Sequence, residues 1–241
     1  SGSQRAVVGA RVERSGRTTT VEVEITPGRA NRGRVNGGSP VRARDVLGIL
    51  RTVQFAPEDL ALVKGDPDGR RRFLDELAVQ LRPQLAAVLA DYERVLRQRS
   101  ALLKTAAGAM RSARGADLRT LDVWDAKLAA TGAHIVAARR GLVAALAPAV
   151  LDAYAQVSAA SGEALITYRT SVDPTSEQAP EPDGGSSEQL IEAQLLEAMG
   201  RVRSREIERG VSLVGPHRDD LVLMLGDLPA KGYASHGESD R

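Results

Sequence analysis

Two apolar stripes with heptad spacing constrain this chain more strongly than any other feature of its sequence. A break between Gly108 and Gly115 separates them, and stripes of this length on both sides of a break predict an antiparallel helical hairpin. Tyr92 and Trp124 are stripe members, which predicts core packing and not base stacking. The first stripe is made of Leu74, Ala78, Leu81, Leu85, Val88, Tyr92, Val95, Arg99 and Leu102. The second is made of Leu121, Trp124, Leu128, Thr131, Ile135, Ala138, Leu142, Ala145 and Ala149.

The two arms of this hairpin are predicted to be long and uneven. At about 1.5 Å per residue, a helix from Asp68 to Lys104 would reach roughly 55 Å. Pro83 and Pro148 each remove one helical hydrogen bond, so we expect a kink in each arm.

Strand patterns flank the hairpin on both sides. Alternating apolar residues predict strands between Ala6 and Val35, and turns at Ser15-Gly16, Pro27-Gly28 and Asn36-Gly37. Short helices are predicted at Ala43 to Leu50 and from Pro57 to Gly65. After the hairpin we predict strands at Ala164 to Val172, Val211 to Val214 and Leu221 to Leu225, and a helix at Leu190 to Ile207. Residues 173–187, rich in Pro, Gly, Ser and Glu, predict an insert of poor order.

Together these elements predict a mainly helical α+β fold, with a long antiparallel helical hairpin on a small β-containing base. Ser1-Gly2-Ser3, without an initiator methionine, is interpreted as a cloning scar on an excised piece. The predicted parts are residues 1–3 as the scar, 4–50 as a β-rich part of a head, 51–163 as a helical lobe, 164–209 as a strand, insert and helix, and 210–241 as a return to the head.

Composition excludes several kinds of site. The chain has no cysteine, which rules out disulfides, thiolate zinc sites and a cysteine nucleophile, and which fits a reducing cytoplasm.

The longest apolar run, near Leu142 to Leu151, is interrupted by Pro148 and is shorter than the roughly 20 residues of a membrane span. We therefore predict no membrane contact. The net charge is only +2, so any nucleic-acid contact must come from local clusters.

The chain also lacks the motifs that bind and hydrolyse a nucleotide. A phosphate loop needs Gly-x-x-x-x-Gly-Lys followed by Ser or Thr, because backbone N–H groups and the lysine cradle the phosphates while the hydroxyl holds magnesium. The sequence contains no such string, and no strand ends in the acidic pair that would position magnesium and water. We therefore assign no catalytic residue, no metal and no cofactor to this chain alone.

Three segments carry a resemblance to a known family. They are Phe55 to Leu60, Gly65 to Asp75 with its Arg70-Arg71-Arg72 run, and Gly215-Pro216-His217-Arg218-Asp219-Asp220-Leu221. Together they resemble the RecF family of bacterial recombination mediators, which are ABC-class ATPases related to the heads of structural-maintenance-of-chromosomes proteins. The resemblance continues along the first arm through Tyr92, Arg94-Val95-Leu96, Gln98-Arg99 and Leu102-Leu103-Lys104.

The resemblance implies a function for the whole protein. It implies a DNA-dependent ATPase of low activity that uses ATP and magnesium, dimerises with a second subunit on ATP binding, and helps RecO and RecR load RecA at gapped DNA. It also implies a cytoplasmic, nucleoid-associated location. Ala234 to Ser239 is similar to the start of the ABC signature, so Ser235 and Gly237 are carried over as residues that contact a nucleotide held by the opposite subunit.

Two clusters of charged residues admit more than one interpretation. Arg70, Arg71 and Arg72 are DNA-binding candidates, although an arginine run in the first turns of a helix is more often solvated or paired with nearby acids. His217, Arg218, Asp219 and Asp220 are expected at a junction between head and lobe, against the alternative of a divalent metal site.

Three functions remain open at this stage. The first is a RecF-like fragment, the second a stand-alone helical hairpin that binds a protein partner and neither DNA nor nucleotide, and the third a metal-dependent hydrolase centred on His217. His134 lies beside a stripe residue and receives no role. Glu58 and Asp59 are explained by the charge preference of a helix start.

Overall fold

The computed structural model describes residues 5–52, 56, 59–111, 119–158, 162–172 and 188–233. The chain forms two compact units. The first comprises residues 1–55 and 76–86, and the second comprises residues 56–75 and 87–241. The mainly helical α+β class is confirmed, and each unit has a small antiparallel sheet of its own among the described residues.

The first unit is built on a four-stranded antiparallel sheet in the order β1-β2-β3-β4. Its strands are β1 (Ala6–Arg14), β2 (Arg17–Ile25), β3 (Arg32–Val35) and β4 (Val41–Arg42). The predicted turns are confirmed: Ser15 and Gly16 both have positive φ (51° and 73°), as the tight turn between β1 and β2 requires. The helix predicted at Ala43 to Leu50 is only one 3-10 turn, η1 (Ala43–Val46), because Leu47 is already extended.

The second unit is mainly helical. Its helices are α1 (Leu60–Lys64), α2 (Pro67–Leu81, whose last residues belong to the first unit), α3 (Leu85–Arg111), α4 (Arg119–Val157), α5 (Glu188–Arg209) and α6 (Ala230–Tyr233). Its strands β5 (Ala164–Arg169), β6 (Asp220–Leu225) and β7 (Leu228–Pro229) form an antiparallel sheet in that order.

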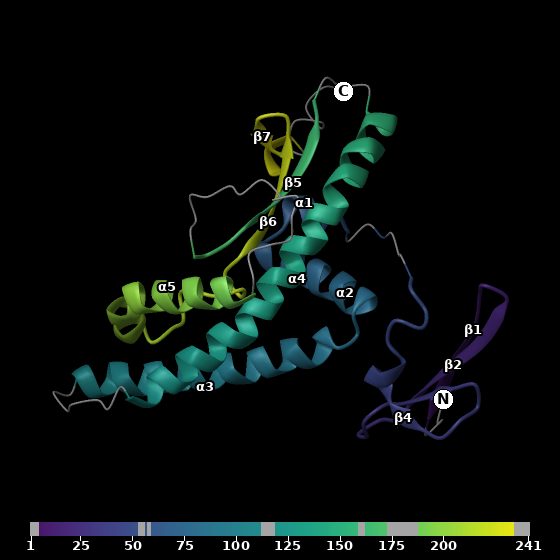
Figure 1. Ribbon diagram of the computed structural model, residues 1–241, viewed down its shortest axis with the longest axis horizontal. Coiled ribbons are helices and arrows are strands. Elements are labelled where there is room, and N and C mark those ends of the chain that lie inside the picture. The colour runs from purple at the N-terminus through teal and green to yellow at the C-terminus, as the bar shows by residue number, and fades with distance from the viewer. Residues whose placement is uncertain are drawn as a thin grey trace. The chain divides into compact units, whose positions relative to one another are not determined.

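The helical hairpin is confirmed, and a third helix joins it. Figure 1 shows α4 returning alongside α3, with α5 beside them. Leu103 and Ala106 of α3, Leu121 of α4 and Ile207 of α5 make one buried apolar cluster. Tyr92 is buried as expected, whereas Trp124 is only half-buried, with the Lys127 ammonium 5.3 Å from its ring centroid.

Proline affects the two arms differently. The first arm is not a kinked single helix but two helices, since α2 ends at Leu81 and α3 begins at Leu85, on either side of Pro83. Pro83 lacks the N–H that would continue the α2 hydrogen bonds. In the second arm α4 runs through Pro148 without a break in its assignment as helix.

The strand predicted at Val211 to Val214 is wrong. This segment is irregular, because its backbone groups bond to side chains instead of to a neighbouring strand. The Leu213 N–H donates to Glu206 Oε1 at 2.7 Å, and the Ser212 carbonyl accepts from Arg218 at 2.9 Å. The insert predicted at 173–187 lies outside the described residues.

Among the described residues, one helix could span a membrane by length and composition. It covers Thr120–Val157, with a mean hydropathy of 1.4 in its most apolar window, a property that core helices of soluble proteins share. Within the fold this helix carries two buried charges, Asp125 and Arg139, that pair with neighbouring elements. The absence of membrane contact stays a prediction.

Candidate functional site

The candidate site is centred on residues 212–220, which link α5 to β6 and which we call the junction segment. At its end, Asp220 accepts two hydrogen bonds from Arg70 of α2, at 2.8 Å to Nε and 3.0 Å to Nη2. The Nη1 of Arg70 also donates to the carbonyls of Leu62 and Gly65, at 3.3 and 2.9 Å. This guanidinium therefore joins α1, α2 and β6 in one buried contact.

Asp219, next to Asp220, is bonded to a different set of groups in the interior. Its side chain is 1% exposed and accepts from the Tyr168 hydroxyl at 2.6 Å and from the Ser171 N–H at 2.7 Å. Burial raises the pKa of Asp219 above its ordinary value, and these hydrogen bonds oppose that shift. Arg71 donates to the Asp219 carbonyl at 2.6 Å and pairs with Asp68. The segment is thus held by the β5 end of the sheet as well as by α2.

Arg139 of α4 holds the middle of the junction segment. It donates from Nε and Nη2 to the two carboxylate oxygens of Asp75, both at 2.8 Å, and from Nη1 to the Pro216 carbonyl at 2.7 Å. Arg139 is 4% exposed whereas Asp75 is half-buried, so water is largely kept from the guanidinium but not from the whole of the carboxylate.

Two glycines let the junction segment approach the helices closely. Gly215 has φ = 131°, and a Cβ on it would lie 2.5 Å from the Tyr92 hydroxyl oxygen. In α4, a Cβ on Gly132 would lie 3.2 Å from Pro216 and 3.3 Å from both Tyr92 and Leu195. A side chain at position 215 would therefore collide, and one at position 132 would be tightly packed unless its neighbours shifted by a few tenths of an ångström.

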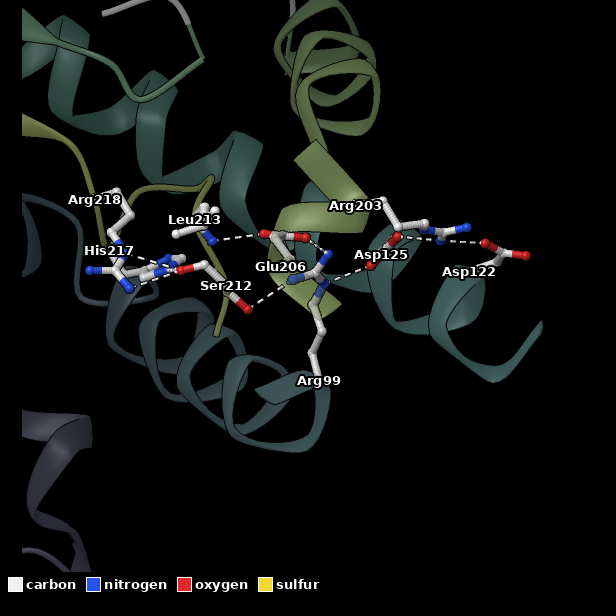
Figure 2. A network of polar contacts seen from close by, with 9 residues as sticks. All are labelled: Arg99, Asp122, Asp125, Arg203, Glu206, Ser212, Leu213, His217 and Arg218. Carbon is white, nitrogen blue, oxygen red and sulfur yellow. Dashed lines mark hydrogen bonds and ion pairs between the residues drawn. The ribbon is translucent and has the colours of Figure 1, made fainter. Parts of the chain in front are cut away.

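Arg99 is the centre of a second network, shown in Figure 2. Its guanidinium donates to Asp125 at 2.6 Å, to the Ser212 hydroxyl at 2.8 Å and to Glu206 at 2.6 Å, and its side chain is completely buried. Arg203 of α5 shares Asp125, at 2.7 Å to its other oxygen. The network therefore joins α3, α4, α5 and the junction segment. Among the buried side-chain polar atoms that the structure describes, only Arg203 Nε lacks a hydrogen-bond partner.

His217 connects the two networks as a neutral imidazole. Its Nε2 lies 3.3 Å from the Ser212 carbonyl, which can only accept, so Nε2 carries the proton and Nδ1 accepts from the Tyr92 hydroxyl at 2.7 Å. Burial, with the positive charges of Arg218, Arg71 and Arg99 nearby, lowers the pKa of His217 to about 4. This histidine is therefore uncharged near neutral pH.

The arrangement does not favour the metal-site alternative. Within the described part of the chain, no group of three His, Asp or Glu side chains could hold a metal ion. The carboxylates of Asp219 and Asp220 are already bonded to Tyr168 and Arg70, and Nδ1 of His217 accepts from Tyr92. What this site does chemically is structural: it fixes the helices to the strand that follows the junction segment.

The structure separates the predicted site residues into three groups. His217, Arg218, Asp219 and Asp220 do come together with the helices, and Arg70 and Arg71 join them through internal hydrogen bonds, which leaves Arg72 as the exposed member of the arginine run. Ser235 and Gly237 lie outside the described residues.

Several members of the networks are not among the predicted site residues, and Arg99, Arg139 and Glu206 are the most deeply connected of them. Arg99 did give a signal, because it is the charged member of an otherwise apolar stripe. Arg139 and Glu206 gave none, since their partners Asp75 and Arg99 lie far from them in sequence. His134, given no role, is exposed, and its Nδ1 lies 2.6 Å from Glu188 Oε2.

Comparison with known proteins places these observations in a family. No family model matches the chain. Among curated proteins, the DNA replication and repair protein RecF of Beutenbergia cavernae is 61% identical over 248 aligned residues, which cover 99% of this chain. RecF of Kineococcus radiotolerans is 58% identical and RecF of Frankia alni 57%, each again over 99% of the chain. Over nearly its full length, the chain is similar to a part of RecF. It spans 62% of the first and third of these RecF proteins and 61% of the second.

Solved RecF structures share the fold. A structure described as the recombination mediator protein RecF-ATPrS in the RecFOR pathway matches with a TM-score of 0.81 at 23% identity, over 98% of this chain and 60% of that one. A second, described as RecF-ATP, matches with a TM-score of 0.74 over 92% of this chain and 55% of that one. At this identity the match concerns the fold alone.

Proposed function

We propose that this chain supplies the helical lobe and part of the head of a RecF-type recombination mediator. In the whole protein this mediator binds ATP and DNA, and it helps RecO and RecR load RecA at gapped DNA. The observation that supports the proposal is the junction segment, whose charged residues connect three long helices to the strand that leads toward the signature-like residues 234–239.

The connection has a mechanical meaning in this proposal. The opposite subunit's ATP would meet Ser235 and Gly237, the residues carried over from the ABC signature. Only β6, β7 and α6 separate these residues from Asp220 in the chain. Arg70 holds the junction segment through a buried ion pair with Asp220, and Arg99 and Arg139 hold it through hydrogen bonds to the Ser212 hydroxyl and the Pro216 carbonyl. In this proposal a displacement of β6 is therefore passed to the helices instead of being absorbed by a loop.

ATP and magnesium enter the proposal only through the whole protein. The chain has no phosphate loop and no acidic pair at a strand end, so its own residues contribute the signature-like segment and not the phosphate cradle. A second subunit, RecO, RecR and DNA are the proposed partners, and a cytoplasmic, nucleoid-associated location follows from that role.

The test is direct DNA binding by this chain. Fluorescence anisotropy with duplex, single-stranded and gapped DNA across a salt series should show a log affinity that falls linearly with log salt, as phosphate contacts require. Failure to bind any of the three at low salt would overturn the assignment of a DNA surface to this chain. Tight binding of a protein partner without salt sensitivity would favour the stand-alone interaction hairpin.

A further inference from the structure

Positive charge is concentrated in the first unit of the chain. Residues 5–52 contain ten arginines and four acidic residues, a formal charge of +6, although the whole chain carries only +2. The rest of the chain, with 23 basic and 27 acidic groups, carries −4. A charge asymmetry of this size within one chain is typical of a part that contacts a polyanion.

The first unit presents part of this charge on a two-stranded ribbon. β1 and β2 pair along nine residues each, but β3 pairs with β2 only from Val21 to Glu24, and Asn36 extends that pairing only to Thr20. Residues 11–14 and 17–19 therefore form a hairpin end without a third strand among the described residues. Figure 1 shows β1 and β2 as this hairpin, in purple.

Arginine is placed differently at the two ends of the sheet. Where β3 is paired, Arg32 and Arg34 lie opposite Glu24 and Glu22, so unlike charges face each other across the strands. At the hairpin end, Arg14 lies directly opposite Arg17. Like charges in this position destabilise a strand pair, so the local fold gives no reason for them.

Arg11, Arg14 and Arg17 are all exposed. Among the described residues no ion pair involves any of the three, although Arg5 and Arg44 of the same unit do pair with carboxylates. Lone charges on an edge strand can serve to prevent sheet-to-sheet aggregation. That explanation accounts for charge on β1 but not for two arginines placed face to face across the hairpin.

The other side chains of the ribbon indicate which polyanion it fits. Thr18, Thr19 and Thr20 follow Arg17, and arginine together with threonine is a common combination at nucleic-acid phosphates. A two-stranded ribbon is also narrow enough for the major groove of duplex DNA. Apart from Val12, residues 11–20 contain no large apolar side chain that would insert into a membrane.

We propose that the β1–β2 hairpin end is a phosphate-contacting surface for duplex DNA, carried by Arg11, Arg14 and Arg17. This inference rests on the proposed function, because it assumes that the chain binds DNA. It replaces the sequence-based candidates Arg70 and Arg71, whose guanidinium groups are already bonded within the second unit.

The experiment compares two triple variants with the same change in net charge. In the first, Arg11, Arg14 and Arg17 are changed to Gln. In the second, Gln replaces Arg94, Arg97 and Arg201, which are exposed and pair with carboxylates on their own helices. The first variant should bind a labelled duplex at least about tenfold more weakly at low salt, and the slope of log affinity against log salt should fall by about 2 to 3. The second should stay within about twofold of the unchanged chain.

The single variant Arg14→Glu distinguishes a loss of DNA binding from a loss of folding. This change places a carboxylate opposite Arg17, so it should hold or raise the thermal stability of the hairpin while weakening DNA binding. The unchanged chain could bind the duplex while the first triple variant binds it with the same affinity and the same slope of log affinity against log salt. The assignment of the DNA surface to the hairpin end would then be wrong, and the proposed function would stand. If the unchanged chain binds no DNA, or binds anionic lipid vesicles in place of DNA, both are overturned.

Discussion

Arg99 and Glu206 form an ion pair in which neither side chain is exposed to solvent, with 2.6 Å between Nη2 and Oε2. The two residues are 107 positions apart in sequence and belong to α3 and α5. A buried pair of this kind contributes little net stability when intact, but the loss of one partner leaves an uncompensated charge in the interior. A single substitution at either residue is therefore expected to destabilise the packing of α5 against the hairpin.

The first prediction concerns this pair. Arg99→Met should lower the free energy of unfolding by about 3 to 5 kcal/mol, because Glu206 and Asp125 would keep their charges without the guanidinium. Urea denaturation measures the change. Adding Glu206→Gln should recover part of the loss, since the amide oxygen can still accept from the Leu213 N–H. Arg201→Met, in an exposed pair with Glu197, should change stability by less than about 1 kcal/mol.

The second prediction concerns the close approach at Gly215. Gly215→Ala should destabilise the protein by about 2 kcal/mol or more, because a side chain is strained at φ = 131° and its Cβ would collide with the Tyr92 hydroxyl. Thermal unfolding measures the loss. Gly200→Ala is the matched control, since it lies in α5 with nothing within 4 Å of the new Cβ and should stabilise by up to about 1 kcal/mol. Equal effects at the two glycines would contradict the packing described for the junction segment.

The third prediction is a pH dependence from His217. In the unfolded chain the imidazole protonates near its ordinary pKa of 6.5, whereas in the folded protein the pKa is lowered to about 4. The unfolded state therefore binds more protons between these values, and stability is lost as the pH falls from 6.5 toward 4. From about pH 7 to about pH 5 the wild-type protein should lose roughly 2 kcal/mol more than His217→Gln.

Urea denaturation at the two pH values tests this difference. Asp219, whose pKa is raised by burial, contributes in the opposite direction at low pH, but it does so in both proteins and cancels in the comparison. Parallel loss of stability in the wild type and the variant would mean that His217 is not the titrating group.

The fourth prediction separates structural from DNA-contacting arginines. Arg70→Gln should lower the free energy of unfolding by about 3 kcal/mol, because Asp220 loses its bidentate partner in the interior. It should leave the salt dependence of DNA binding unchanged. A salt slope that fell by about 1 without any loss of stability would show that Arg70 contacts a phosphate after all.

Helices were easier to predict from this sequence than their ends. Apolar residues at heptad spacing identify α3 and α4 because one face of each helix must be buried. The break at Pro83 was predicted only as a kink, since a proline can bend a helix or end it, and tertiary packing decides between the two. Val211 to Val214 has the composition of a strand, but here the backbone bonds to Glu206 and Arg218.

The candidate site was predictable only in part. The resemblance identified His217 to Asp220 as a junction, and it could do so because these residues are contiguous. Their partners are scattered: Arg70, Tyr92, Arg99 and Arg139 reach the junction segment from three different helices. An ion pair between residues more than 100 positions apart leaves no local pattern, so Arg99 is distinguished in the sequence only by its charge within an apolar stripe and by its place in the resemblance.

The distance in sequence between Arg70 and Asp220 also sets an order of events during synthesis. The residues of α2, α3 and α4 leave the ribosome well before the junction segment exists, so Arg70, Arg99 and Arg139 cannot yet bury their charges against it. The nascent hairpin must therefore remain loosely packed until the junction segment is made, which for Asp220 is 150 residues after Arg70. Chaperones have most reason to bind this chain during that interval, when its apolar stripes are formed but their charged neighbours still face water.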